Sequence, residues 1–142
     1  MHHPPELVLL ALNKMNKDTL METLQIEFTE VGEDYLIAKM PVSPKVHQPY
    51  GLLHGGASIA LAESVGSSFS ALSIDNEKFK VLGMQMSANH LKSMKEGDVF
   101  AKATFLKKGK QTHLVQIILE DQEKNIISIC NLTNFIQEKK VY

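Results

Sequence analysis

Residues 47–72 read HQPYGLLHGGASIALAESVGSSFSAL, and this stretch decides the fold. Its first part is expected to be a loop, because Pro49 and two adjacent glycines interrupt regular structure. From Gly56 to Leu72 the composition shifts to Ala, Ser, Leu and other residues that favour a helix. Almost all side chains of this helix are small or apolar, so we expect it to be long and nearly all buried.

The segments on either side of the long helix alternate apolar and polar side chains, which is the pattern of half-buried strands. A short amphipathic helix over residues 6–16 and a hairpin of two strands are expected before the long helix. Four more strands follow it, separated by turn-like residues, and these are expected to form a four-stranded antiparallel meander. The expected strands cover residues 24–29, 36–42, 79–92, 98–106, 112–120 and 126–137.

This order of elements predicts an α+β fold in which one face of an antiparallel sheet packs on a long central helix. The chain has 142 residues, of which 44% are hydrophobic, and that is enough to fill one sizeable core. No linker or repeat divides it. We therefore expect a single domain over residues 1–142, with an N-terminal helical segment at 1–20.

The charge pattern excludes several classes of partner. Fifteen basic residues nearly balance sixteen acids, so no overall field attracts nucleic acid or an anionic membrane. Every basic residue is Lys, so a bound phosphate must meet Lys, His or backbone N–H groups. No segment approaches the roughly 20 apolar residues that span a bilayer, and the single Cys130 suits a reducing compartment. We expect a cytoplasmic protein without nucleic-acid or membrane partners.

Glu63 is the only formally charged side chain between Lys45 and Asp75. A carboxylate on an apolar helix loses hydration, and a fold with no use for it would be more stable with an uncharged residue. This favours a catalytic carboxylate, and the alternative is a structural hydrogen-bond partner. Ser67 follows one helical turn later on the same face, where it either bonds the carboxylate or an attacking water, or is a small packing residue.

Gly55 and Gly56 stand at the expected N-terminus of the long helix, where backbone N–H groups and the helix dipole favour negative charge. An N–H donor at Gly55 would stabilise a tetrahedral oxyanion by about 3 to 4 kcal/mol, although a glycine pair is also a common way to start a helix. Gly55 and Glu63 are about 12 Å apart along a helix, too far to meet one reacting group. We expect Gly55 of one subunit to face Glu63 of another across a two-fold interface.

The string His47-Gln48-x-x-Gly51-x-x-His54-Gly55-Gly56, with Glu63 seven residues beyond Gly56, resembles hotdog-fold acyl-coenzyme A thioesterases. The similarity is to the phenylacetate-degradation (PaaI-like) and Arthrobacter-type 4-hydroxybenzoyl-CoA branch. Asn89-His90-x-Lys92 and Glu96-Gly97-Asp98 support it, so it covers residues 20–137. It implies the hotdog fold, in which a curved sheet wraps a long helix, and dimers that join their sheets edge to edge and pair into tetramers.

The resemblance also implies residue roles. Glu63 would be nucleophile or general base, and the Gly55 N–H would bind the thioester oxygen. Gln48 and His54 would shape the site, and Ser67 would orient the water. The substrate would be an acyl-CoA, with coenzyme A as part of the substrate and no separate cofactor.

Coenzyme A is implied to lie at the subunit surface near four residues: Gly83, Asn89, His90 and Lys92. For the lysines of the 107–110 turn, a solvated hairpin tip is at least as good an interpretation as a contact with coenzyme A. His113 is expected to face solvent or core without chemistry.

Two other functions remain open from the sequence. The first is a non-catalytic hotdog module that binds acyl-CoA as a regulator, but a binder gains nothing from a desolvated carboxylate at Glu63. The second is a hydratase or dehydratase acting on an acyl thioester, for which His54 would supply the histidine. The scattered histidines lack metal-ligand spacing, so no metal site is expected.

Overall fold

The structure is a computed structural model that describes residues 3–142, so Met1 and His2 of the expected domain lie outside the described residues. The elements, in chain order, are α1 (Pro5–Met15), α2 (Leu20–Thr23), β1 (Glu27–Val31), β2 (Leu36–Pro41), a 3-10 turn (Pro44–Val46), α3 (Gly55–Leu72), β3 (Phe79–His90), β4 (Asp98–Lys108), β5 (Thr112–Glu120) and β6 (Ile126–Glu138).

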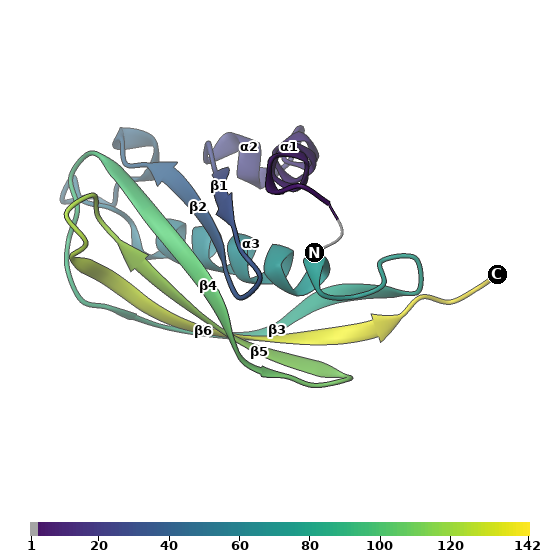
Figure 1. The fold of residues 1–142 in the computed structure, drawn as a ribbon. Coiled ribbons are helices and arrows are strands. Elements are labelled where there is room, and N and C mark those ends of the chain that lie inside the picture. The colour runs from purple at the N-terminus through teal and green to yellow at the C-terminus, as the bar shows by residue number, and fades with distance from the viewer. Residues whose placement is uncertain (1–2) are drawn as a thin grey trace.

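The six strands form one antiparallel sheet in the order β1-β2-β4-β5-β6-β3. The sheet curves along one side of α3, which crosses its concave face (Figure 1). An antiparallel sheet with one face covered by a helix buries its apolar side chains on that face only. The α+β class and the hotdog arrangement expected from the sequence are therefore confirmed.

The expected four-stranded meander is wrong in one respect. Only β4, β5 and β6 are consecutive neighbours, whereas β3 lies on the far edge beside β6, and β4 pairs with β2. The reason lies in residues 91–97, which cross the end of the sheet instead of forming a tight turn. Leu91 N–H donates to the Ile127 carbonyl, and Met94 is buried beneath the loop that precedes α3.

The core lies between α3 and the inward side chains of the strands. Burial of each such aliphatic side chain contributes about 1.5 to 3 kcal/mol. None of the helices among residues 3–142 is both long and apolar enough to cross a membrane. The largest apolar side chains that are fully buried are Leu36, Met40, Leu61, Val65, Val99, Val115, Ile117, Leu119 and Leu132.

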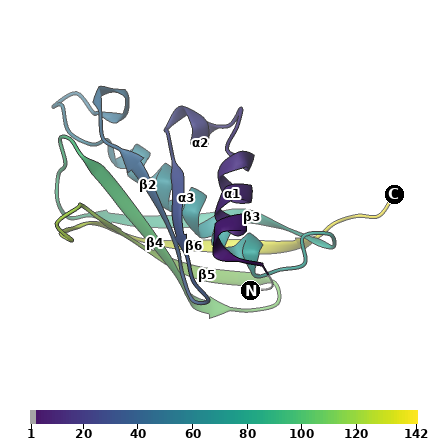
Figure 2. The ribbon, with the colours of Figure 1, turned by 45° about the horizontal axis from the view of Figure 1, so that its top comes forward.

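The two edges of the sheet differ. α1 lies beside β1 (Figure 2), and the side-chain amide of Asn13 both donates to the Phe28 carbonyl at 2.9 Å and accepts from the Phe28 N–H at 2.8 Å. Asn16 donates to the Ile26 carbonyl at 2.9 Å. These asparagines replace the hydrogen bonds that another strand would make, so the β1 edge is covered.

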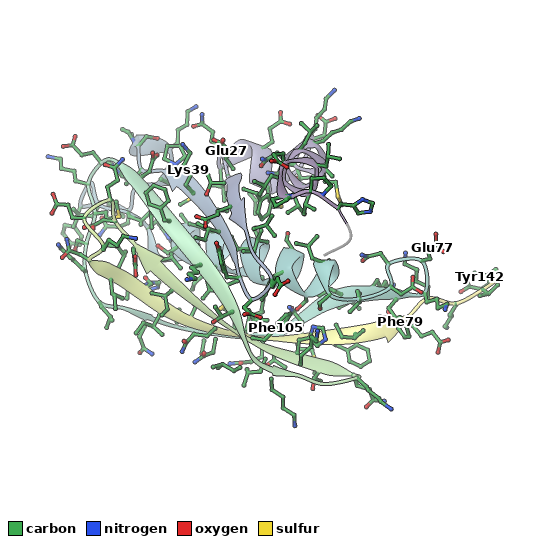
Figure 3. The ribbon with its side chains drawn as sticks, in the orientation of Figure 1. Glu27, Lys39, Glu77, Phe79, Phe105 and Tyr142 are labelled. Atoms are coloured by element: carbon green, nitrogen blue, oxygen red, sulfur yellow. The ribbon has the colours of Figure 1, made fainter. Side chains whose placement is uncertain are left out.

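On the β1–β2 pair itself, Glu27 and Lys39 lie directly opposite each other, and their side chains form an ion pair at 3.7 Å (Figure 3). β3, at the other edge, pairs with β6 alone among the described residues. Its middle is exposed, including the apolar side chains of Leu82 and Met84. An uncovered strand with exposed apolar side chains is a surface that proteins usually pair or protect.

Candidate active site

The first cluster of predicted residues surrounds the N-terminus of α3. His54 is the N-cap, and its Nδ1 accepts a hydrogen bond from the Gly56 N–H at 2.7 Å. Because Nδ1 accepts, the ring carries its proton on Nε2. Gly55 is the first residue of the helix, and no acceptor among the described residues takes its N–H. That group, at the positive end of an 18-residue helix, is available to an external oxygen.

The loop before α3 brings Gln48 to the same place. Gln48 N–H donates to the Leu52 carbonyl at 2.7 Å, and Gly51, which closes this turn, has φ +77°. Such a positive φ favours glycine, which accounts for Gly51. The Gln48 side-chain oxygen accepts from the Tyr50 N–H within the turn, so its amide nitrogen remains for another partner.

A cavity of about 250 Å³ lies at this end of the helix, and four of the predicted residues line it: Gln48, Gly55, His90 and Lys92. His90 packs on Gly55 so closely that a Cβ on Gly55 would lie 2.7 Å from His90 Nε2. The buried Ser128 hydroxyl holds the other ring nitrogen of His90, with 2.7 Å between Nδ1 and Oγ. A side chain at position 55 would therefore have to displace the imidazole.

Lys92 is held beside this cavity by an acid that the sequence analysis missed. Its Nζ lies 3.8 Å from Asp121 Oδ2. Hydrogen bonds from the Asn125 side chain, and then from backbone N–H groups, lower the pKa of Asp121. The carboxylate is thus ionised at neutral pH and orients the lysine. A larger cavity, of about 640 Å³, lies on the convex face of β1, β2, β4 and β5 and contains none of the predicted residues.

The second cluster contains Glu63, about two turns further along α3. Its side chain is exposed in the single chain, so the expectation of a helix buried on nearly all sides is wrong. The sheet covers only one side of α3, and the buried positions therefore recur every three to four residues. These buried residues are Ser58, Leu61, Ala62, Val65, Gly66, Phe69 and Ser70.

Glu63 lies over β3. A Cβ on Gly83 would stand 2.5 Å from Glu63 Oε1, so the carboxylate occupies the space that any larger residue would fill. The β3–β6 register shifts between Gly83 and Gln85, which leaves Met84 as an extra residue in a bulge. Bulges of this kind bend a strand and redirect its side chains, and they are frequent next to active sites.

Ser67 contacts a polar group in the core that the sequence analysis missed. Its Oγ lies 3.5 Å from Asn134 Oδ1, and Asn134 Nδ2 lies 2.9 Å from Ser70 Oγ and 3.4 Å from the Gly66 carbonyl. Asn134 has no exposed surface. The sequence did contain a signal, because Asn134 shares the inward parity of Cys130, Leu132 and Ile136 on the same strand.

The structure thus divides the predicted residues between the N-terminal end and the middle of one helix. Gln48, His54, Gly55, His90 and Lys92 lie at the N-terminal end. Asn89 is exposed beside His90 on β3. Glu63, Ser67 and Gly83 lie further along, and within one chain Gly83 is roughly 23 Å from His90 along the strand.

His113 is buried in the core, edge-on to the Phe105 ring with 5.2 Å between centroids. Burial, and then the charge of Lys108, lowers the pKa of His113. Lys108 itself lies over the Phe105 ring, 5.6 Å from its centroid. The histidine is therefore a neutral packing residue.

Residues 50–128, more than half of the chain, match the family model of the thioesterase superfamily. The chain is 39% identical over 131 residues to the 1,4-dihydroxy-2-naphthoyl-CoA hydrolase of Escherichia coli strain K12, and the match covers 92% of this chain and 96% of that protein. It is 41% identical over 117 residues to a proofreading thioesterase of Cronobacter turicensis, covering 82% of this chain and 85% of that one.

Solved structures of thioesterases share the fold of this chain. The crystal structure of a mutant thioesterase from Pseudomonas aeruginosa superposes with a TM-score of 0.91 at 37% identity, over 92% of this chain and 94% of that chain. A thioesterase structure from Haemophilus influenzae gives a TM-score of 0.89 at 35% identity, over 92% and 90%.

Proposed function

The chain belongs to the thioesterase superfamily and is a thioester hydrolase, and we propose that it splits an acyl-coenzyme A into a free acid and coenzyme A, with Glu63 as the catalytic carboxylate. Within the superfamily we assign it to the phenylacetate-degradation and 4-hydroxybenzoyl-CoA branch. The loop motif from His47 to Gly56 supports this assignment. The 1,4-dihydroxy-2-naphthoyl-CoA hydrolase among the relatives supports an aromatic acyl group.

One observation carries the proposal: α3 presents a free N–H at Gly55 and an exposed carboxylate at Glu63. A thioester hydrolase needs a donor for the developing oxyanion and a base or nucleophile on the other side of the carbonyl carbon. About 12 Å of helix separates the two groups within one chain. They serve one thioester when Gly55 of one subunit faces Glu63 of its partner.

The reaction then follows from these two groups. The thioester oxygen lies at the Gly55 N–H, where the helix dipole stabilises negative charge. Glu63 of the other subunit takes a proton from water as the water oxygen attacks the carbonyl carbon. Collapse of the tetrahedral intermediate breaks the carbon–sulfur bond, and the thiolate of coenzyme A leaves. The proton on Glu63 returns to the products. In the alternative route a Glu63 oxygen attacks the carbonyl carbon directly, the thiolate leaves, and water then hydrolyses the resulting acyl-enzyme anhydride to the free acid and the restored carboxylate.

The open edge of the sheet supports the two-fold pairing. β3 carries Gly83 and the exposed Leu82 and Met84, and its pairing with β3 of a second subunit would cover them. The opposite edge is closed by Asn13. A homodimer is therefore required for activity, and we extend the proposal to a homotetramer of two such dimers. A cytoplasmic location is part of the same proposal, supported by the free thiol of the single Cys130.

For coenzyme A we propose the surface near His90, Lys92 and Asn89, with Gly83 contributed by the other subunit. The chain has no arginine, so Lys92, held by Asp121, is the cation best placed to meet a phosphate. The acyl group would lie towards Glu63.

The first experiment measures release of free thiol from benzoyl-, phenylacetyl-, hydroxybenzoyl- and hexanoyl-CoA. Glu63→Gln is expected to lower the rate by about 10² to 10⁴, the range of general-base catalysis, while acyl-CoA still binds. Glu77→Gln, an exposed acid just after α3, is the matched control and keeps wild-type activity. If the wild type binds acyl-CoA but releases no thiol, the protein is a non-catalytic acyl-CoA-binding regulator instead.

A second experiment tests the shared site. Gly55→Pro removes the N–H donor at a helix position whose backbone suits proline, and its Cβ also displaces His90 of the same chain. Mixed with Glu63→Gln, it forms heterodimers in which one site has both intact groups, so the mixture is expected to regain about a quarter of wild-type activity after random exchange. Failure to regain activity in dimers that demonstrably exchange contradicts the two-fold site.

The hydratase reading receives no support from the N-cap. His54 uses Nδ1 to hold the Gly56 N–H, which leaves only the Nε2 proton for an external group. A hydratase or dehydratase would instead interconvert a 2-enoyl thioester and a 3-hydroxyacyl thioester by adding or removing water, without releasing thiol, so a 2-enoyl-CoA added to the panel tests this function.

A further inference from the structure

We infer that Asn134 is a positioning residue for this reaction. It accepts a hydrogen bond from the Ser67 hydroxyl, which leaves the Ser67 oxygen to accept a hydrogen bond from the attacking water. The inference rests on the proposed thioester hydrolysis, and it adds a residue for which neither the motif nor the exposed surface gave a role. It follows from the direction of three polar contacts beneath α3.

The orientation of the Asn134 amide is fixed by its neighbours. One end of the amide lies 3.4 Å from the Gly66 carbonyl oxygen and 2.9 Å from Ser70 Oγ. A carbonyl oxygen can only accept, so the end that faces Gly66 must be the NH₂ group. The other end, Oδ1, therefore faces Ser67.

The direction of the Ser67 contact follows from that orientation. Ser67 Oγ lies 3.5 Å from Asn134 Oδ1, and an amide oxygen has no hydrogen to give, so Ser67 is the donor. At 3.5 Å the contact is long for two oxygens, and it orients the hydroxyl without holding it tightly. The only hydrogen of the hydroxyl points at Asn134, and its lone pairs are left for a third partner.

The third partner has a defined place beside β3. Asn134 lies directly opposite Gly83 in the sheet. The position of a Cβ on Gly83 is 2.5 Å from Glu63 Oε1 and 3.9 Å from Asn134 Oδ1, so both oxygens border the same spot. Ser67 follows Glu63 by one turn on the same face of α3.

A water beside Gly83, in contact with both Glu63 and Ser67, would donate one hydrogen to each of them. Its lone pairs then point away from these two acceptors, and one of them is directed towards the thioester carbon. On attack, the O–H bond to Glu63 breaks, Glu63 takes the proton, and the new carbon–oxygen bond forms; the proton leaves later with the coenzyme A thiolate. Ser67 receives a hydrogen bond throughout and exchanges no proton.

The test compares two variants of the same shape. Asn134→Thr keeps an oxygen that accepts from Ser67, whereas Asn134→Val does not. With the acyl-CoA that the wild type hydrolyses best, Asn134→Val is expected to lower kcat about tenfold or more with little change in KM, and Asn134→Thr to retain most of kcat. Asn134→Ala replaces Asn134→Val if the valine variant does not fold.

Two further variants separate positioning from packing. Ser67→Ala combined with Asn134→Val is expected to be no slower than Ser67→Ala alone, because both remove one unit. Ser70→Ala breaks another bond of Asn134 without touching Ser67, so it should lower the urea midpoint but leave kcat within about twofold.

Three outcomes would each overturn the inference. The first is equal kcat for Asn134→Thr and Asn134→Val, and the second is a loss of kcat in the double variant that equals the product of the two single losses. The third is a loss of kcat in Ser70→Ala as large as in Asn134→Val. These outcomes differ from failure of the proposed function. If the wild type releases no thiol, the hydrolysis itself is refuted and the role of Asn134 falls with it. If the wild type is active, Glu63→Gln is inactive and the double variant is additive, only the role of Asn134 is lost.

Discussion

Gly83 lies beneath the carboxylate of Glu63, and the space for its missing side chain is occupied by Glu63 Oε1. The carboxylate and the edge strand are therefore in contact at a position where any side chain would displace the carboxylate. A bulge at the next residue, Met84, bends the strand at the same point. The location of the carboxylate thus depends on the strand as well as on the helix that carries it.

Replacement of Gly83 by Ala should displace that carboxylate. The new Cβ would stand 2.5 Å from Oε1, so Glu63 must move, and kcat is expected to fall by roughly 10², the effect of misplacing a reacting group by about 1 Å. Thiol release and the urea midpoint measure the two effects separately. Ser87→Ala, an exposed position on the same strand, is the control. Unchanged kcat in Gly83→Ala would show that the carboxylate does not act from this position.

Replacement of Gly55 by Ala should collide with His90, because the added Cβ would lie 2.7 Å from Nε2 of a ring that Ser128 holds. We expect a loss of kcat of about tenfold or more. If the collision is the cause, His90→Ala in the same chain restores part of kcat, at the cost of weaker coenzyme A binding seen as a higher KM. A double variant slower than either single variant argues against this explanation.

Removal of the Asn13 amide should destabilise the fold. Asn13→Ala leaves the N–H and carbonyl of Phe28 without their partners, which is expected to cost about 1 to 3 kcal/mol of unfolding free energy. Urea unfolding measures it. Lys14→Ala, an exposed neighbour on the same helix, should change little. The same midpoint in both variants would mean that water replaces the asparagine without loss.

The buried His113 predicts a pH dependence of stability. Burial and the charge of Lys108 lower its folded pKa below the ordinary value of 6.5, so protonation is disfavoured in the folded state. Its contribution is complete above pH 6.5 and is lost as the pH falls through the folded pKa. The urea midpoint should therefore fall from pH 7.5 to about pH 5, and less so in His113→Leu. An equal fall of the urea midpoint in the wild type and in His113→Leu would show that other groups cause the pH dependence.

The sequence was sufficient to predict the class of fold and most of the elements. Alternation along β5 and β6 and the Ala- and Ser-rich stretch of α3 depend on local period, which a sequence displays directly. The place of β3 does not depend on local period. Its side chains alternate like those of a meander strand, and its neighbour is decided by residues 91–97, which cross the sheet end.

The candidate site was predicted from its motif residues, and its supporting residues were not. Glu63 stood out because it is the only charge on its helix, but the helix lies on one face of the sheet, so a single chain leaves the carboxylate exposed. Ser128, Asp121 and Asn134 act through contacts with residues far away in sequence, 38, 29 and 67 positions from their partners His90, Lys92 and Ser67. Spacing along a chain carries no information about such contacts.

The asparagine-covered edge of β1 also limits stoichiometry. If β3 pairs with β3 of a second subunit, two six-stranded sheets become one continuous sheet, and both of its outermost strands are β1. Each of these strands already has its outward hydrogen bonds at Phe28 satisfied by Asn13. Growth by strand addition therefore ends at two subunits, and the same open edge that would build a dimer cannot propagate into a filament.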